Sequence, residues 1–194
     1  GGGAVNAIPD NVVLESYVRG SSLEVINQAN ERVNRALCGA ALSLGANIDI
    51  QDTPGYAPLM NSEGMMQLAV EASQIVSEIP CIRNEVMGSG STDMGDLSAI
   101  MPVVHPYVPG AVGISHGVDY YVENPELACV TSAKWQVAML TLLLKDDAAR
   151  AKMIMDGFKP PFASKEEYFR YVDSFYTAGD RITYQEDGVA RVRL

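Results

Sequence analysis

The chain has 194 residues, a length that suits one or two small domains and is sufficient to bury a hydrophobic core. Hydrophobic residues make up 47% and charged residues 20%, which is ordinary for a globular protein. The net charge of −10 argues against nucleic acid or an anionic membrane surface as a partner, because both usually require a basic face. No apolar run reaches the ~20 residues of a membrane-spanning helix. We therefore expect no membrane segment and no signal peptide, and a cytoplasmic location.

The first 60 residues combine a strand pattern with a helix pattern. Apolar residues alternate over 12–19, which predicts a strand with one buried face. Ser21 or Ser22 then serves as the N-cap of a helix whose apolar residues recur at helical spacing until Gly45 ends it. A second alternating run covers 46–51. This order, strand, helix, strand, is half of a split β-α-β sandwich.

The remainder of the chain is predicted to be mainly helical, with short strands between the helices. The pattern predicts helices over 62–76, 125–144, 148–156 and 165–176, a short helix or buried segment over 97–101, and a strand over 81–87. Residues 103–114 are predicted as a strand pair or as one long strand broken at Pro109-Gly110. The helix over 125–144 is apolar nearly all round its C-terminal half, which favours a buried position in an α/β body.

The three cysteines, Cys38, Cys81 and Cys129, are odd in number and widely spaced. Each lies in apolar sequence, and no CxxC pair of the zinc-binding kind is present. The pattern predicts buried free thiols in a reducing compartment.

A glycine- and hydroxyl-rich turn over 89–93 is a candidate binding element. Glycine allows main-chain N–H groups to approach an oxyanion, and hydroxyl groups add donors, so Gly90, Ser91 and Thr92 are candidate substrate contacts. The turn lacks the lysine and spacing of a phosphate-binding loop. The structural alternative is that Thr92 or Asp93 only caps a helix. Ser91 lacks a histidine and acid in triad-like context, which argues against a serine hydrolase.

The two histidines, His105 and His116, are candidate metal ligands, and His116 is the stronger one. It follows a strand and precedes a glycine turn, at the kind of strand edge where sites of α/β proteins collect. A neutral imidazole there can ligate zinc. One histidine, even with Asp93 or Asp119, is too few ligands, so either further ligands lie outside this chain or this is no metal site. His105 in its apolar strand is typical of a hydrogen-bonded core residue.

Asn6 and Arg19 flank the first predicted strand. As a binding pair, Arg19 would clamp a substrate carboxylate through two hydrogen bonds, and Asn6 would hold a carbonyl group. The alternative is a turn cap and a solvated charge. The aromatic residues near the C-terminus favour helix packing or a partner-contact face: they are Tyr168, Phe169, Tyr171, Phe175 and Tyr176.

Taken in order, these pieces resemble the dinuclear zinc aminoacylase and carboxypeptidase (peptidase M-twenty) family, in a branch similar to aminobenzoyl-glutamate hydrolase. The resemblance extends from residue 1 to about 145. It rests on Asn6 in NAIPD, Arg19 in VVLESYVR, GYAPLMN over 55–61, GSTDMG over 90–95, His105-Pro106-Tyr107, and His116 in SHGVDYYVENPE.

The resemblance implies a fold of class α+β or α/β in three parts. Residues 1–60 resemble the second half of a ferredoxin-like lid domain that mediates dimerisation. Residues 61–147 resemble the C-terminal part of an α/β zinc-hydrolase catalytic domain. Residues 148–194 have no template and are expected as a helical C-terminal extension.

The resemblance also assigns roles. His116 matches a zinc ligand, Arg19 the arginine that binds the substrate's free carboxylate, and Asn6 a lid residue that reaches the partner subunit's site. Gly90, Ser91 and Thr92 match the turn that lines the substrate pocket. His105 matches a position that is often histidine in this branch, without an assigned role.

The remaining metal ligands and the general base of such enzymes have no match here. The chain is therefore expected to be a C-terminal fragment of a homodimeric amidohydrolase that binds two zinc ions and cleaves an N-acyl amino acid or a dipeptide-like substrate. Without its N-terminal half it would be inactive and would not retain zinc. The alternatives are a non-catalytic dimerisation or interaction module and an α+β domain that binds a small anion at 88–96.

Overall fold

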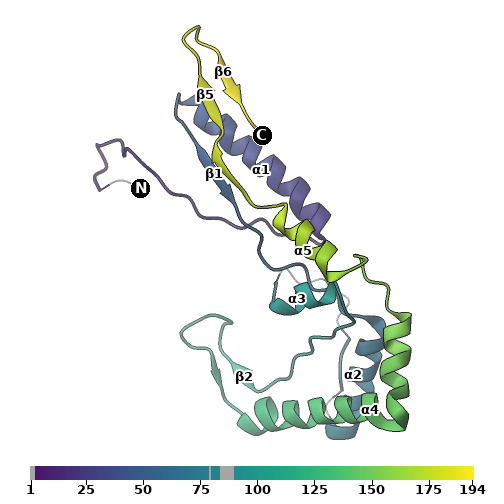
Figure 1. Cartoon of the computed structure of the whole chain (residues 1–194). Helices are drawn as coiled ribbons and strands as arrows, with labels where there is room; N and C mark the ends of the chain where they lie inside the picture. Colours follow the sequence, from purple (N-terminus) through teal and green to yellow (C-terminus); the bar gives the residue numbers. More distant parts are fainter. Residues whose placement is uncertain (1–2, 79, 84–89) are drawn as a thin grey trace. The chain divides into compact units, whose positions relative to one another are not determined.

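The structure is a computed structural model that describes residues 3–78, 80–83 and 90–194. Helices and short strands are mixed along the chain (Figure 1). The chain divides into two compact units, one formed by Gly1–Ile50 with Gly179–Leu194 and the other by Gln51–Ala178. These bounds differ from the three parts that the resemblance implies, because the C-terminal residues join the first unit.

The first unit is built on α1 (Leu23–Ser43), as predicted from the spacing of apolar residues. Ser22 is the N-cap, and its side chain accepts a hydrogen bond of 3.2 Å from the main-chain N–H of Val25. Gly45 follows the helix with a φ of +66°, a conformation that glycine adopts without a steric cost. Both ends of the predicted helix are confirmed.

The strand predicted over 12–19 is wrong. This segment has no regular secondary structure, and Val12, Val13, Leu14 and Tyr17 expose more than half of their surface. A strand requires a hydrogen-bonded neighbour, and within the described residues this segment pairs with none. The alternating apolar residues of this segment are therefore exposed to solvent and do not form a buried strand face.

The strands that lie wholly or partly in the first unit come from residues 49–52 and from residues 177–192. β1 (Asp49–Asp52) confirms the second predicted strand in part, and it pairs with β4 (Thr177–Asp180). β5 (Ile182–Tyr184) and β6 (Ala190–Val192) form an antiparallel hairpin. The main-chain N–H of Arg181 donates to the oxygen of Ile48 at 2.9 Å. Residues 148–194 thus contain three strands besides helical segments. The ferredoxin-like lid stays a prediction.

The second unit has its core between α2 (Glu63–Val76) and α4 (Ser132–Gly157), which pack against each other (Figure 1). Ser62, where the predicted helix begins, is the N-cap of α2. The buried side chains of the core are Leu68, Ala69, Ala72, Trp135 and Leu142. The apolar side chains of the two predicted helices therefore face each other.

The elements between α2 and α4 differ from the predicted ones in position or length. α3 (Asp93–Ser98) begins four residues before the helix expected over 97–101. Of the strand expected over 103–114, only β2 (Ala111–Val112) forms a ladder, with β3 (Tyr121–Val122). The strand predicted over 81–87 has no strand in its described part, 81–83, and its remainder lies outside the described residues.

The helix that starts after Pro125 opens as a π-helix, η1 (Glu126–Thr131), and continues as α4. α4 is bent at Lys145, and Asp146, Asp147 and Ala148 all have positive φ. The segment Glu126–Gly157 is long and apolar enough to cross a membrane, which corrects the expectation that no segment is. The core helix of a soluble protein passes the same test, and here α2 covers one side of α4.

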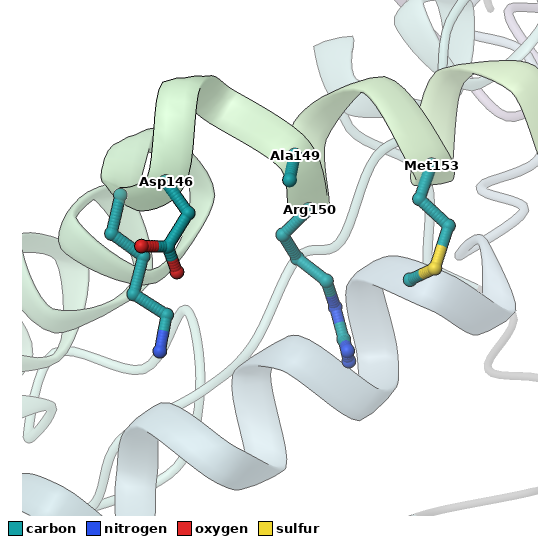
Figure 2. A pocket seen from close by; sticks show the side chains of 5 residues that line it. Asp146, Ala149, Arg150 and Met153 are labelled. Atoms are coloured by element: carbon teal, nitrogen blue, oxygen red, sulfur yellow. The ribbon is translucent and has the colours of Figure 1, made fainter.

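The bend in α4 leaves a shallow hollow of about 250 Å³ (Figure 2). Its lining is Lys145, Asp146, Ala149, Arg150 and Met153. The Arg150 side chain points from α4 toward the neighbouring helix, where its guanidinium lies 3.7 Å from the Glu71 carboxylate. The hollow is smaller than most ligand pockets, and none of the residues proposed for binding lines it.

All three cysteines are free thiols, as predicted. Cys38 is buried and Cys81 is partly buried, but Cys129 is exposed, so the prediction of burial is wrong there. Cys129 lies in the π-helix that precedes α4, and no residue of this π-helix is buried by the described part of the chain.

Candidate functional site

The turn Gly90–Thr92 leads directly into α3, and Thr92 caps that helix. Its side-chain oxygen accepts a hydrogen bond of 3.2 Å from the N–H of Met94, and its main-chain oxygen accepts one of 2.9 Å from Gly95. Gly90 is exposed, while Ser91 and Thr92 are partly buried. The capping role of Thr92 is confirmed. Gly90 is the exposed residue of the turn.

A polar network fixes α3 against the segment that precedes α2. The Asp96 carboxylate accepts hydrogen bonds from the N–H of Ala57 at 3.0 Å and from the Tyr168 hydroxyl at 2.5 Å. Gly95 lies so close to this segment that a Cβ atom there would be 1.8 Å from the oxygen of Ala57. The hydroxyl of Ser98 accepts a hydrogen bond from the N–H of Met60 at 3.1 Å. These contacts hold α3, the helix that directly follows the turn at residues 90–92, in place.

Two tyrosines contact the aspartates of α3. Burial, and then the hydrogen bond to Asp96, raise the pKa of Tyr168 well above its ordinary value. A hydrogen bond to Asp93 and the charge of that carboxylate raise the pKa of the exposed Tyr56. The two carboxylates so close to the turn argue against the small-anion site considered for 88–96. Sequence reasoning missed this network; the acids spaced three apart at the start of a helix were its only local signal.

His105 is held by its main chain rather than by its imidazole. Its N–H donates a hydrogen bond of 3.0 Å to the side-chain oxygen of Asn61, and its ring lies 5.2 Å from the ring of Tyr107. Among the described residues, its buried Nδ1 has no hydrogen-bond partner. The predicted hydrogen-bonded core histidine is therefore wrong for the side chain.

His116 lies in the turn that joins β2 and β3. The N–H of Gly117 donates to the oxygen of Ile114 at 2.7 Å, which closes a turn with His116 at its third position. His116 is exposed and has a φ of +66°, in the left-handed region that glycine favours. A non-glycine residue held in this conformation costs on the order of 1 kcal/mol, and such residues cluster at functional sites. The side chain is thus accessible at a strained position.

The described residues do not by themselves fit a zinc site. A zinc site needs at least three protein ligands, and in 3–78, 80–83 and 90–194 no group of three His, Cys, Asp or Glu side chains is placed to hold a metal ion. His116 would contribute one ligand to a site completed by other polypeptide.

Asn6 and Arg19 belong to the first unit, and the other predicted residues belong to the second. Asn6 is exposed in a turn before the extended segment. Arg19 is exposed close to the start of α1, with its guanidinium carbon 5.9 Å from the centre of the Tyr17 ring. Both side chains are accessible to a ligand.

Two curated relatives show similarity over most of the chain. The Xaa-Arg dipeptidase of Mus musculus is 26% identical over 171 residues, which cover 85% of this chain and 39% of the relative. The Xaa-Arg dipeptidase of Homo sapiens is 26% identical over 182 residues, which cover 90% of this chain and 41% of the relative. No family model and no solved structure matches the chain. The similarity indicates a distant relationship to peptidases.

The extent of the similarity bears on the C-terminal residues. The chain spans about two fifths of the length of the curated relatives it matches. The resemblance over 1–145 covers about three quarters of the chain, whereas the alignments cover 85% and 90%. The aligned part therefore includes some of residues 146–194, which were expected to have no template.

Proposed function

We propose that the chain is part of a hydrolase of the peptidase class that cleaves the amide bond of an N-acyl amino acid or a dipeptide-like substrate. The observation that carries this proposal is the similarity to the two Xaa-Arg dipeptidases over 85% and 90% of the chain. Because it spans about two fifths of their length, the complete activity would require further polypeptide.

Two features of the described residues support a role in substrate binding. Arg19 is exposed, and a guanidinium can bind the free carboxylate of a dipeptide through two parallel hydrogen bonds. The exposed side of the turn Gly90–Thr92 offers main-chain and hydroxyl donors to the substrate. The net charge of −10 would attract a substrate with a cationic side chain, such as the arginine in the name of the relatives.

His116 is the residue we propose as a metal ligand. In an intact homodimeric enzyme it would supply one imidazole to a pair of zinc ions, and the other ligands and the general base would come from polypeptide outside the 194 residues. The backbone strain at an exposed histidine supports this role, since the turn itself would be more stable with glycine there. We assign no catalytic step to the chain alone.

The test compares the 194-residue chain with a longer protein that includes the coding region before Gly1. Both are assayed for zinc content and for hydrolysis of an alanyl-arginine dipeptide. We expect zinc and hydrolysis only in the longer protein. Hydrolysis by the 194 residues alone would contradict the expected inactivity. Absence of both zinc and hydrolysis in the longer protein would overturn the proposed function.

Variants of the longer protein separate the two proposed roles. Arg19→Gln removes the proposed carboxylate contact and should raise KM for the dipeptide; Arg19→Lys, which keeps the charge but lacks the planar pair of donors, should recover only part of the loss. His116→Ala should instead lower the zinc content. Equal effects of both substitutions on zinc would contradict the assignment of Arg19 to the substrate.

A second candidate function is a non-catalytic interaction module. It is favoured by the many large apolar side chains that the described residues expose, among them Tyr107, Ile114 and Val118 near the β2–β3 turn. Such a module would self-associate or bind a partner chain without taking up zinc. The zinc measurement on the longer protein therefore separates it from the hydrolase.

A further inference from the structure

We propose that Tyr168 is a positioning residue for the turn Gly90–Thr92, acting through its hydrogen bond to Asp96. The inference rests on the proposed function only in that it takes this turn as the part that meets the substrate. Tyr168 belongs to α5 (Lys165–Asp173), in the C-terminal stretch for which the family resemblance offers no role. Through Tyr168, α5 would help to position the turn Gly90–Thr92.

The path from Tyr168 to the turn has four links. The Tyr168 hydroxyl donates to Oδ1 of Asp96, and the same oxygen accepts the N–H of Ala57. Ala57 in turn lies directly against Gly95, whose own N–H donates to the main-chain oxygen of Thr92. Three of these links are hydrogen bonds, and the fourth is the contact of Gly95 with Ala57, which leaves no room for a side chain at Gly95. A displacement of Asp96 would therefore reach Thr92 within one helical turn.

Burial makes the bond between Tyr168 and Asp96 hard to replace by water. Only 3% of the surface of Tyr168 is exposed, and its ring is packed by Phe162 and Phe169 at centroid distances of 5.2 and 5.9 Å. A hydroxyl placed so deeply requires a partner, and the carboxylate supplies one. The aromatic packing fixes the ring, and the fixed ring orients the carboxylate.

Tyr56 adds a second tyrosine to the same helix, on Asp93. It is about half exposed, so its bond to the carboxylate competes with water, unlike that of Tyr168. Of the two, Tyr168 is the one from which we expect a measurable effect on the position of α3.

The test uses the 194-residue chain and two matched variants, Tyr168→Phe and Tyr171→Phe. Both remove one hydroxyl from α5, but it is the Tyr168 hydroxyl that donates to Asp96, whereas the Tyr171 ring packs against Phe162 and Phe175. Amide hydrogen exchange is followed by NMR at Ala57 and Gly95, with Leu68 in α2 as the reference for the core. We expect Tyr168→Phe to accelerate exchange at Ala57 and Gly95 about tenfold to a hundredfold, with Leu68 unchanged.

Tyr171→Phe should leave all three amides as they are. In an Asp96→Ala background, Tyr168→Phe should have no further effect, because the two residues act through one bond. Unchanged exchange at Ala57 and Gly95, or equal acceleration at Leu68, would overturn the proposal by giving Tyr168 a merely structural role or none.

A second measurement needs no substitution. Burial and the hydrogen bond to Asp96 raise the pKa of Tyr168, so its ring signals should stay unshifted while pH passes the ordinary tyrosine value of about 10. A shift of the Tyr168 ring signals near that ordinary value would contradict the proposal. If the longer protein never hydrolyses a dipeptide, the proposed function fails, whereas the exchange data still decide the role of Tyr168.

Discussion

The indole Nε1 of Trp135 donates a hydrogen bond of 2.7 Å to the main-chain oxygen of Ala69, across the interface of α4 and α2. Both residues are buried, and Ala69 lies in the middle of α2. The bond fixes the axial position of one helix against the other, where apolar contact alone would allow sliding. Since the chain has a single tryptophan, its fluorescence reports on this interface.

Leu68→Ala should destabilise the second unit by about 2–5 kcal/mol, because Leu68 is 0% exposed and its loss leaves a cavity between α2 and α4. Ile75→Ala on the same helix is the matched control, since that side chain is 64% exposed and should cost within about 0.5 kcal/mol. Urea denaturation followed by Trp135 fluorescence measures both. Similar midpoints for the two variants would contradict the placement of the core.

Gly95→Ala should destabilise α3 strongly, because a Cβ atom there would lie 1.8 Å from the main-chain oxygen of Ala57 and the backbone must move. Gly39→Ala in α1 provides the contrast, as nothing lies within 4 Å and alanine favours a helix by about 0.5–1 kcal/mol. We expect a lower melting temperature for the first variant and an equal or higher one for the second, measured by circular dichroism. A tolerated Gly95→Ala would show that the segment of Ala57 does not pack on α3.

The sequence predicts those elements of the fold that depend on contacts between residues close together in the chain. Two of the predicted helices, α1 and α2, form with Ser22 and Ser62 as their N-caps, because cap and apolar spacing act within a few residues. The segment 12–19 has the alternation of a strand but no neighbour to pair with in the described residues. Alternation predicts which face would be buried; it does not provide the partner.

The candidate site follows the same rule. Thr92 as a helix cap was predictable from its neighbours, and His116 as an exposed turn residue from the glycine after it. The bond between Asp96 and Tyr168 joins residues 72 positions apart, and no short-range pattern pairs them. For Tyr168 the sequence favours helix packing or a partner-contact face, and its burial agrees with packing. The contact of its hydroxyl with Asp96 is visible only in the folded chain.

The raised pKa of Tyr168 predicts a loss of stability in alkaline solution. The folded state holds the proton more tightly than the unfolded chain, whose tyrosine ionises near its ordinary value of about 10. The stabilisation is therefore complete below pH 10 and declines as pH rises from there toward the folded pKa. Urea denaturation between pH 8 and 11 should give a steeper decline for the wild-type chain than for Tyr168→Phe. Equal slopes would contradict the burial of the Tyr168 hydroxyl beside the Asp96 carboxylate.

The positive φ of His116 predicts that the turn is less stable than it would be with glycine at this position. His116→Gly should stabilise the turn by a few tenths to about 1 kcal/mol, because glycine adopts a φ of +66° without a steric cost and the imidazole has no task in the chain alone. Ser115→Gly is the matched control at the neighbouring position, which lacks a positive φ, and should destabilise the turn. Exchange of the Gly117 amide, bonded to the oxygen of Ile114, measures both locally. Faster exchange in His116→Gly than in the wild-type chain would mean that the histidine supports the turn, and its strained backbone would then be no argument for a role in binding. Slower exchange in His116→Gly, together with loss of zinc when the same substitution is made in the longer protein, would mean that His116 serves to bind a ligand and that its presence lowers the stability of the turn.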